Sequence, residues 1–242
     1  MTSALESFEA AGGVGQRGCP GSTAQEWQQL WIQPFPDGSW SSVVVFGRER
    51  SFVVEQALFE GYHRVGGDDG AQAQTLAGLP VTVELNSQHP RVLLDDGSVV
   101  VAEYLGAPGR WVPRPAVVIW DELGGAEGDL GVPMANVNFR DGRLLQAFAG
   151  GFIEQLDGDS VRAQLADTED AAMAAEELVS AGPGLVRLYD ETAYYVTDSG
   201  ERQWVPTAEV WFCLGGEDAL LAPDRVDGWV VARLPTAGNA EC

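Results

Sequence analysis

Apolar residues gather along the chain in short amphipathic stretches, and each stretch runs into a glycine pair or a Gly-Pro-Gly run. These stretches, with their glycines, cover residues 5–13, 57–67, 116–125, 174–184 and 208–216. Each is typical of a short helix, because glycine alone reaches the left-handed conformation of a helix end without a steric cost. Their recurrence predicts an array of small repeated units.

Strand and turn signals follow the glycines. Gly-x-Pro segments stand at residues 18–20, 78–80 and 131–133, where proline ends a helix and fixes the direction of the chain. Runs of β-branched and aromatic residues then flank Asp-Gly or Gly-Gly pairs, which predicts β-hairpins over residues 33–46, 93–101 and 145–154. Trp-Val-Pro tripeptides at residues 111–113 and 204–206 lead a last strand into the next helix.

The order of these signals predicts an α+β fold of about five degenerate units of strand hairpin, helix and Gly-Gly. The units fall roughly at residues 1–33, 34–91, 92–144, 145–185 and 186–242, within a single repeat domain over residues 1–242. Such units cannot bury their apolar faces alone, so we expect them to stack into a closed or strongly curved, propeller-like ring. A strand at residues 228–232 would close the ring by pairing near the N-terminal unit, which removes exposed sheet edges.

With this order of motifs the chain resembles the LGFP repeat family. The best match runs from Leu130-Gly131-Val132-Pro133 to Phe148-Ala149-Gly150-Gly151, and residues 35–80 match nearly as well. The resemblance covers most of the chain. It implies a non-catalytic module that attaches to cell-wall polysaccharide, or to a glycan linked to peptidoglycan, in actinobacteria and other bacteria.

The charge balance excludes two classes of partner. The net charge at pH 7 is −22, and all 14 basic residues are arginine. Nucleic-acid binding and attraction to an anionic membrane both need clustered positive charge, so neither is expected. No apolar stretch is long enough to span a bilayer, and we expect no membrane insertion.

The resemblance implies a location in the cell envelope or outside the cell. The first residues nevertheless lack the basic and apolar regions of a signal peptide. Three explanations stay open: a leader absent from this sequence, another export route, or a virion component that reaches the wall from outside.

Three cysteines, Cys19, Cys213 and Cys242, have no metal-ligand spacing. Cys19 and Cys213 stand at apolar positions of the repeat, which favours buried thiols, and Cys242 could be free. The alternative is a Cys19–Cys213 disulfide that joins the first and last units.

Catalytic chemistry has little support in the sequence. His63 and His89 are the only histidines, and they lie in different predicted elements. No serine, threonine or cysteine stands in a nucleophile elbow. Acid pairs such as Asp95-Asp96 fit turns better than a glycosidase site in a chain with 36 acids, and Asp157-Gly158-Asp159-Ser160 lacks the other ligands of a calcium loop. We therefore expect no enzyme, no metal and no cofactor.

Aromatic rings are the better candidates for ligand contact, because flat rings stack on the apolar faces of sugars. Trp40, Trp111 and Trp204 stand near hairpins or strand–helix junctions, and together with Tyr194 they are the predicted glycan-stacking residues. Packing between units is the competing interpretation for the three tryptophans.

Other tryptophans are expected to have structural roles. Trp120 and Trp211 fall on apolar helix faces and are expected in the core. Trp27 and Trp31, four residues apart, are expected on one face of a helix that begins near Ser22.

The sequence therefore predicts a non-enzymatic module that recognises bacterial cell-wall glycan by aromatic stacking. The alternative from another class is a structural or host-wall-binding virion (phage) protein whose repeats mediate the assembly of protein subunits. An acidic inhibitor of a basic partner, supported by the net charge of −22 alone, ranks last.

Overall fold

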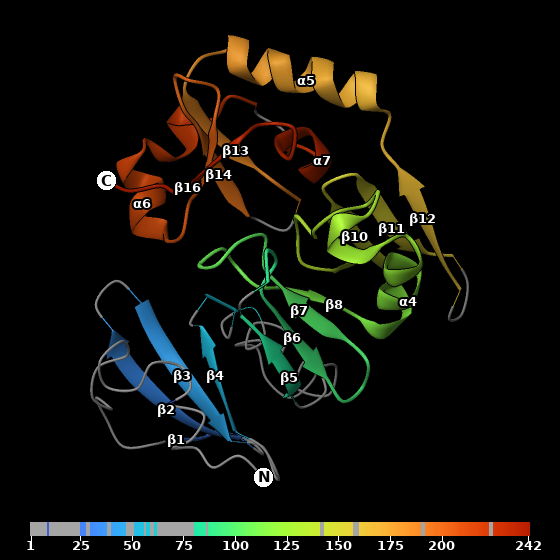
Figure 1. Ribbon diagram of the computed structural model, residues 1–242. Coiled ribbons are helices and arrows are strands. Elements are labelled where there is room, and N and C mark those ends of the chain that lie inside the picture. Colours follow the sequence, from blue (N-terminus) through green and yellow to red (C-terminus); the bar gives the residue numbers. More distant parts are fainter. Residues whose placement is uncertain are drawn as a thin grey trace. The chain divides into compact units, whose positions relative to one another are not determined.

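The structure is a computed structural model of the 242-residue chain. It describes residues 9, 25–27, 30–37, 40–46, 51–55, 57–58, 61, 80–85, 87–140, 143–156, 160–189, 192–222 and 225–242. The chain divides into two compact units, Met1–Arg114 and Pro115–Cys242. Four-stranded sheets and helices alternate along the chain (Figure 1), which confirms the α+β class.

The first unit contains two antiparallel sheets, each a meander of four strands in chain order. The strands of the first sheet are β1 (Gln25–Trp27), β2 (Leu30–Asp37), β3 (Trp40–Phe46) and β4 (Ser51–Glu55). Those of the second are β5 (Pro80–Glu84), β6 (Arg91–Leu94), β7 (Val99–Val101) and β8 (Arg110–Val112). Strand β6 crosses the predicted boundary between residues 91 and 92, so the sheets do not coincide with the predicted units.

The second unit contains the other two described sheets and several helices. One sheet has the order β12-β11-β10-β9, and the other the order β13-β14-β15-β16, with β16 parallel to β15. The strands are β9 (Asn138–Arg140), β10 (Arg143–Phe148), β11 (Gly151–Gln155), β12 (Val161–Leu165), β13 (Gly184–Arg187), β14 (Ala193–Val196), β15 (Arg202–Trp204) and β16 (Thr236–Asn239). The helices are α4 (Arg114–Glu122), which begins at the boundary of the units, α5 (Thr168–Ser180), α6 (Ala208–Cys213) and α7 (Gly228–Val231), with 3-10 turns η2 (Gly125–Glu127) and η3 (Gly216–Ala219).

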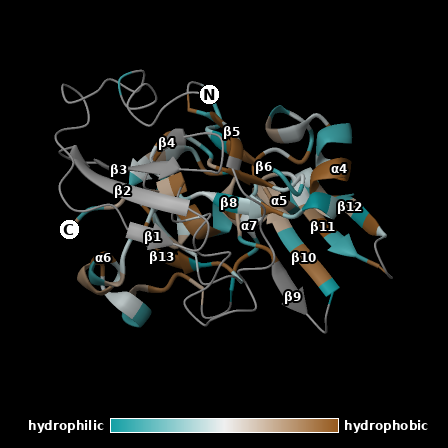
Figure 2. Ribbon diagram, turned by 90° about the horizontal axis from the view of Figure 1, so that it is seen from below, coloured by the Kyte–Doolittle hydropathy of each residue, from teal (hydrophilic) through white to brown (hydrophobic). Residues whose placement is uncertain are grey.

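The hairpins predicted from turn signals are confirmed. Asp37 pairs with Trp40 where β2 turns into β3, and Phe148 pairs with Gly151 where β10 turns into β11. Gly97, between β6 and β7, has a φ of 83°, the left-handed conformation that such tight turns require. Burial alternates along β10, as expected for a strand with one buried face, and Figure 2 shows both hydrophilic and hydrophobic residues on this strand.

The prediction of a helix carrying Trp27 and Trp31 is wrong, because both residues lie in strands. Trp27 ends β1, Trp31 lies in β2, and Glu26 pairs with Trp31 in the antiparallel register. The spacing of four residues that suggested a helix face arises here from a hairpin. The aromatic and β-branched residues that follow Trp31 favour strand over helix.

The closed, propeller-like ring is also wrong. Each of the four sheets among the described residues is open, with an edge strand on either side. Residues 228–231, predicted as the closing strand, form the short helix α7, and the last strand, β16, pairs with β15 of its own sheet. Val231 is fully buried in α7, so packing of this helix outweighs the strand preference of valine.

Two of the predicted helix–glycine stops are confirmed in full. Helix α4 is followed by Gly124 and Gly125, and α6 by Gly215 and Gly216, with φ angles between 58° and 107°. These are left-handed conformations, so each helix ends where the chain needs glycine.

The third helix is longer than predicted. Helix α5 begins at Thr168 because the Asp167 carboxylate accepts hydrogen bonds from the N–H groups of Glu169 and Asp170, at 2.8 and 3.2 Å. It ends shortly before Gly182, whose φ is 95°. The helices predicted near residues 5–11 and 57–65 lie largely outside the described residues, although Glu9, Ala57, Leu58 and Gly61 are helical.

The β13–β16 sheet is the central layer of the second unit, because its strands alternate between two apolar clusters. Val186, Leu188, Tyr194 and Val196 join one cluster with Ala175 and Leu178 of α5 and Val230 and Val231 of α7. Leu185, Ala193 and Val205 join the other cluster, against which Val210 and Trp211 of α6 and the following Leu214 pack. Helices α5 and α7 therefore cover one face of the sheet and α6 the other (Figure 1).

We predict that two equivalent tryptophans contribute unequally to stability. Trp120 stands four residues before Gly124 and is 1% exposed, and its indole N–H donates to the Gly131 carbonyl at 2.8 Å. Trp120→Phe should lower the free energy of unfolding by about 2 kcal/mol, because it leaves that carbonyl unpaired and opens space in the core. Trp211→Phe, at the partly buried equivalent position before Gly215, should cost less than about 1 kcal/mol. Urea unfolding measures both, and equal losses would contradict this interpretation.

Candidate functional site

Two of the four predicted stacking residues are buried. Trp111 lies in the middle of β8 and is 4% exposed, and Tyr194 lies in β14 and is 5% exposed. A ring this buried has no free face for a sugar, so we correct both to core residues. Trp40 opens β3, but its side chain lies outside the described residues and its role stays a prediction.

The face of the Tyr194 ring is occupied within the protein. The guanidinium carbon of Arg202 lies 5.6 Å from the centre of the ring, a cation–π distance. Arg202 is itself buried, and its Nε donates to the Leu234 carbonyl at 3.0 Å. Arg202 therefore links Tyr194 of β14 to the segment that follows α7.

Trp204 keeps part of its ring exposed and remains a candidate. It ends β15, pairs with Tyr194 on one side and with Asn239 of β16 on the other, and packs at the margin of the cluster beneath α5 and α7. A pair of stacked rings contacts the same apolar cluster through Trp229. The rings of Phe152, in β11, and Trp229, in α7, stack with centres 5.7 Å apart and planes 30° apart, and both are partly exposed. We call Phe152, Trp204 and Trp229 the aromatic margin.

Close packing of α7 fixes the place of Trp229. A Cβ on Gly228 would lie 2.8 Å from the Met134 Cβ and 3.4 Å from the Ala147 Cβ, so only glycine lets the helix approach β10 this closely. Trp229 follows directly and meets Phe152 on the neighbouring strand β11. The position of Gly228 thus brings a ring from the C-terminal part of the chain onto the β9–β12 sheet.

Sequence reasoning missed Phe152 and Trp229. Residues 228–232 have the composition of a strand, and the helix signal is one residue, Asp227, at the N-cap of α7. The partner of Trp229 lies far back in sequence, and no local pattern predicts such a pair.

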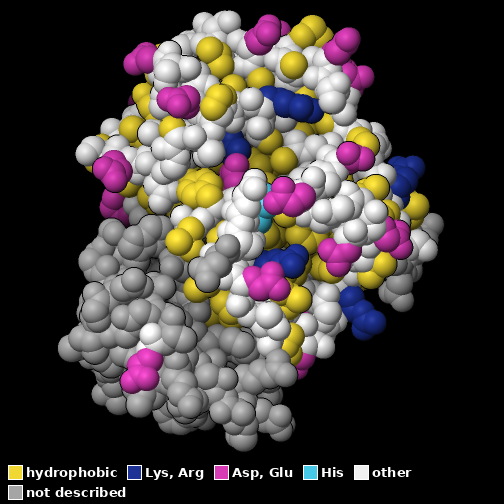
Figure 3. Space-filling view, viewed as in Figure 1, with side chains coloured by type: hydrophobic (Ala, Val, Ile, Leu, Met, Phe, Trp, Pro, Cys, Tyr) yellow, Lys and Arg dark blue, Asp and Glu magenta, His cyan; other side chains and the backbone are white. Residues whose placement is uncertain are grey.

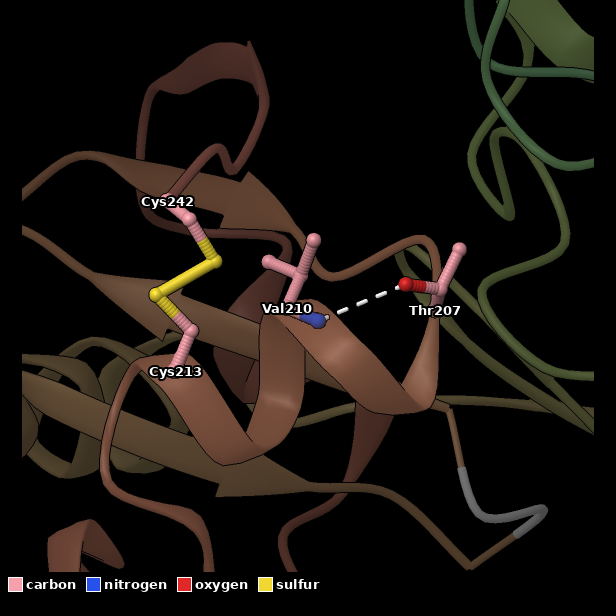
Figure 4. Close-up of a disulfide and its surroundings, with 4 residues drawn as sticks. All are labelled: Thr207, Val210, Cys213 and Cys242. Carbon is pink, nitrogen blue, oxygen red and sulfur yellow. Dashed lines mark hydrogen bonds between the residues drawn. A yellow bond between two sulfur atoms is a disulfide. The ribbon is translucent and has the colours of Figure 1, made fainter.

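The far side of the sheet carries a helix that is fixed at both ends (Figure 4). At its start the Thr207 hydroxyl accepts a hydrogen bond from the Val210 N–H at 3.3 Å. At its end Cys213 forms a disulfide with Cys242, with the two Cα atoms 6.0 Å apart. The expectations of a buried Cys213 thiol, a free Cys242 and a Cys19–Cys213 bond are therefore wrong, and Cys19 lies outside the described residues.

The local environment shifts the pKa values of two carboxyl groups in opposite directions. Hydrogen bonds from its own backbone N–H and from the Thr207 hydroxyl lower the pKa of Glu209, which is fully exposed on α6. Partial burial raises the pKa of Asp227, at the start of α7, because desolvation disfavours the charged form.

Acidic side chains prevail over basic ones on the described surface that Figure 3 shows. Among the described residues, no three side chains of histidine, cysteine, aspartate or glutamate come together as metal ligands would. The described part of the chain likewise contains no helix long and apolar enough to cross a membrane.

His89, half-buried before β6, has its Nδ1 2.7 Å from the Glu103 carbonyl oxygen, a contact that fixes the ring in a loop. His63 lies outside the described residues.

No protein-family model matches the chain, and no curated protein is significantly similar to it. The resemblance to LGFP repeats therefore stays a prediction.

We predict that the Cys213–Cys242 disulfide stabilises the second unit. Cys213→Ser combined with Cys242→Ser should lower the free energy of unfolding by about 3 kcal/mol, because the bond closes a long loop in the unfolded chain. Urea unfolding with and without a thiol reductant measures this effect. The control, Cys19→Ser, should leave the response to reductant unchanged, and a Cys19 variant that abolishes this response would contradict the pairing.

We predict that Asp227→Asn raises the stability of the protein at neutral pH. The folded state holds this carboxyl with a raised pKa, so the wild type loses stability as the pH rises through that value. The gain of the variant should disappear below the ordinary aspartate pKa of 3.8, where the carboxyl is protonated in both states. The urea midpoints of the wild type and of Asp227→Asn, measured across this pH range, test the prediction. Glu176→Gln on α5 is the control. A gain that persists unchanged at low pH would exclude the carboxylate as its cause.

Proposed function

We propose that the chain is a non-enzymatic binding module that recognises bacterial cell-wall glycan through the aromatic margin. The proposal keeps the ligand class that the LGFP-like motifs imply but revises the set of residues that stack on the glycan. Trp204 remains a proposed stacking residue, and Phe152 and Trp229 are added to the site. The buried Trp111 and Tyr194 are removed from it.

The partly exposed stack of Phe152 and Trp229 is the observation that carries the proposal. Two rings held at 5.7 Å by a packed helix and a sheet present rigid apolar edges beside polar backbone, and rigid aromatic rings bind with little loss of side-chain entropy. Trp204 adds a third ring at the margin of the same core. Pyranose rings, which have apolar faces and polar rims, suit such a surface.

The disulfide supports the location that this ligand requires. Both Cys213 and Cys242 are exposed, and an exposed disulfide persists in oxidising compartments outside the cytosol. An envelope, extracellular or virion location, as the sequence predicted, agrees with this bond.

We predict that substitutions in the aromatic margin weaken binding to cell walls. Trp229→Leu and Trp204→Leu keep apolar volume in the core but remove the flat indole face, so retention of the purified protein on insoluble actinobacterial walls should fall about tenfold. Soluble wall polysaccharide should release the wild type. Urea midpoints near that of the wild type would show that both variants are folded.

Phe212→Leu is the matched control, because Phe212 is an exposed ring on α6, which covers the other face of the β13–β16 sheet. It should leave retention unchanged. Equal retention of all variants would contradict the aromatic margin as the site. No retention of the wild type, with a large discrete oligomer in light scattering, would favour the alternative of a virion protein assembled through subunit contacts.

A further inference from the structure

Phe212 is the most exposed of the large apolar side chains among the described residues, at 73%. An exposed phenylalanine on a flexible segment would have little meaning, since single apolar residues are common on surfaces. This one stands on a helix that is capped by Thr207, packed on the sheet through Val210 and Leu214, and followed by the disulfide of Cys213. The ring is therefore held in the geometry in which a partner would meet it, which lowers the entropic cost of binding.

The ring lies beside a second aromatic side chain. A Cβ built on Gly216 would lie 3.5 Å from Phe212 Cδ1 and 3.5 Å from Trp211 Nε1, so both rings border this glycine. Gly216 has a φ of 58° and is itself buried, so the two rings cover this glycine.

Carboxylates stand close to these rings in the sequence, or next to the disulfide that joins α6 to the end of the chain. Glu209 lies one helical turn before Phe212, Glu217 and Asp218 directly follow Gly216, and Glu241 precedes the cysteine that is bonded to α6. All four are exposed or partly exposed, and residues 207–222 and 234–242 contain no basic residue. One carboxylate is paired, since Arg187 Nη1 lies 2.8 Å from Glu217 Oε1, and the exposed pair is weak enough to exchange partners. We call Trp211, Phe212 and these four carboxylates the α6 patch.

The negative charge of the α6 patch favours some classes of binding partner and disfavours others. A second copy of this chain would bring another acidic patch, at which Arg187 already pairs with Glu217, and a net charge of −22 on each copy opposes that contact. Nucleic acid and anionic lipid are repelled for the same reason. A cationic side chain fits both features, because a guanidinium or ammonium group stacks on an aromatic ring and pairs with nearby carboxylates.

We propose that the α6 patch is a docking site for a basic protein segment, with Phe212 as its anchor and an arginine or lysine of the partner stacked on the ring. The carboxylates attract the segment and fix its register, and the ring supplies the contact that removes water. This surface is separate from the aromatic margin, so it does not depend on the proposed glycan site. A module with both surfaces would link the cell wall to a basic protein.

A labelled peptide tests the proposal directly. The probe is a fluorescein-labelled peptide of alternating arginine and glycine, titrated against the whole protein and followed by fluorescence anisotropy at low and physiological salt. Phe212→Ser should weaken binding about tenfold, and Glu209→Gln about two- to threefold at low salt. The controls are Met173→Ser and Glu176→Gln on α5, which remove an apolar side chain of 57% exposure and an exposed carboxylate from another surface.

The comparison of variants decides the outcome. Selective loss in Phe212→Ser and Glu209→Gln supports the α6 patch. Equal affinities for all four variants would show attraction to the net charge alone and overturn the proposal. Dimerisation of the wild type that Phe212→Ser abolishes would also overturn it, because the occupant would then be a second copy. Trp229→Leu should bind the peptide like the wild type even if it loses the cell wall, so failure of one proposal is distinguishable from failure of the other.

Discussion

The second unit depends on the two-residue alternation of the β13–β16 sheet. Neighbouring residues such as Leu185 and Val186 are both fully buried, yet they belong to different apolar clusters on opposite faces. A strand can satisfy both clusters only if its register is fixed, because a slip by one residue would exchange the faces. The helices follow from this constraint, since α5 and α7 need one face of the sheet and α6 needs the other.

The same constraint separates the two proposed surfaces. Trp229 is held on the α7 side by the close approach of Gly228 to Met134, whereas Phe212 is held on the α6 side, next to the disulfide. Each ring is rigid because the element that carries it is packed on the central sheet. Binding at one proposed surface would therefore not need to disturb the other.

Local chemistry made several elements predictable from sequence. The turn at Gly97, the stop of α4 at Gly124 and the burial of Trp120 each depend on a few neighbouring residues and were predicted correctly. The ring closure was predicted wrongly because it required a strand at residues 228–231. Those residues form a helix through contacts with Met134 and β10, far away in the chain.

The candidate site was less predictable for a related reason. Sequence position suggested Trp111 and Tyr194 as glycan-stacking residues. Whether a ring is buried depends on what packs over it, and Arg202 packs over the ring of Tyr194. The stacked partner of Trp229, Phe152, comes from another sheet. The disulfide escaped prediction too, since spacing alone gives no Cα separation for Cys213 and Cys242.

Amide hydrogen exchange followed by mass spectrometry tests the role of the central sheet most directly. Strand β14 is an inner strand of its sheet and is covered on both faces, whereas β12 is an edge strand with Leu165 51% exposed. If the account is correct, peptides that cover β14 exchange slowest in the second unit and those that cover β12 exchange much faster. Exchange of β14 at the rate of β12 would contradict it, because the sheet would then not be the layer on which both surfaces depend.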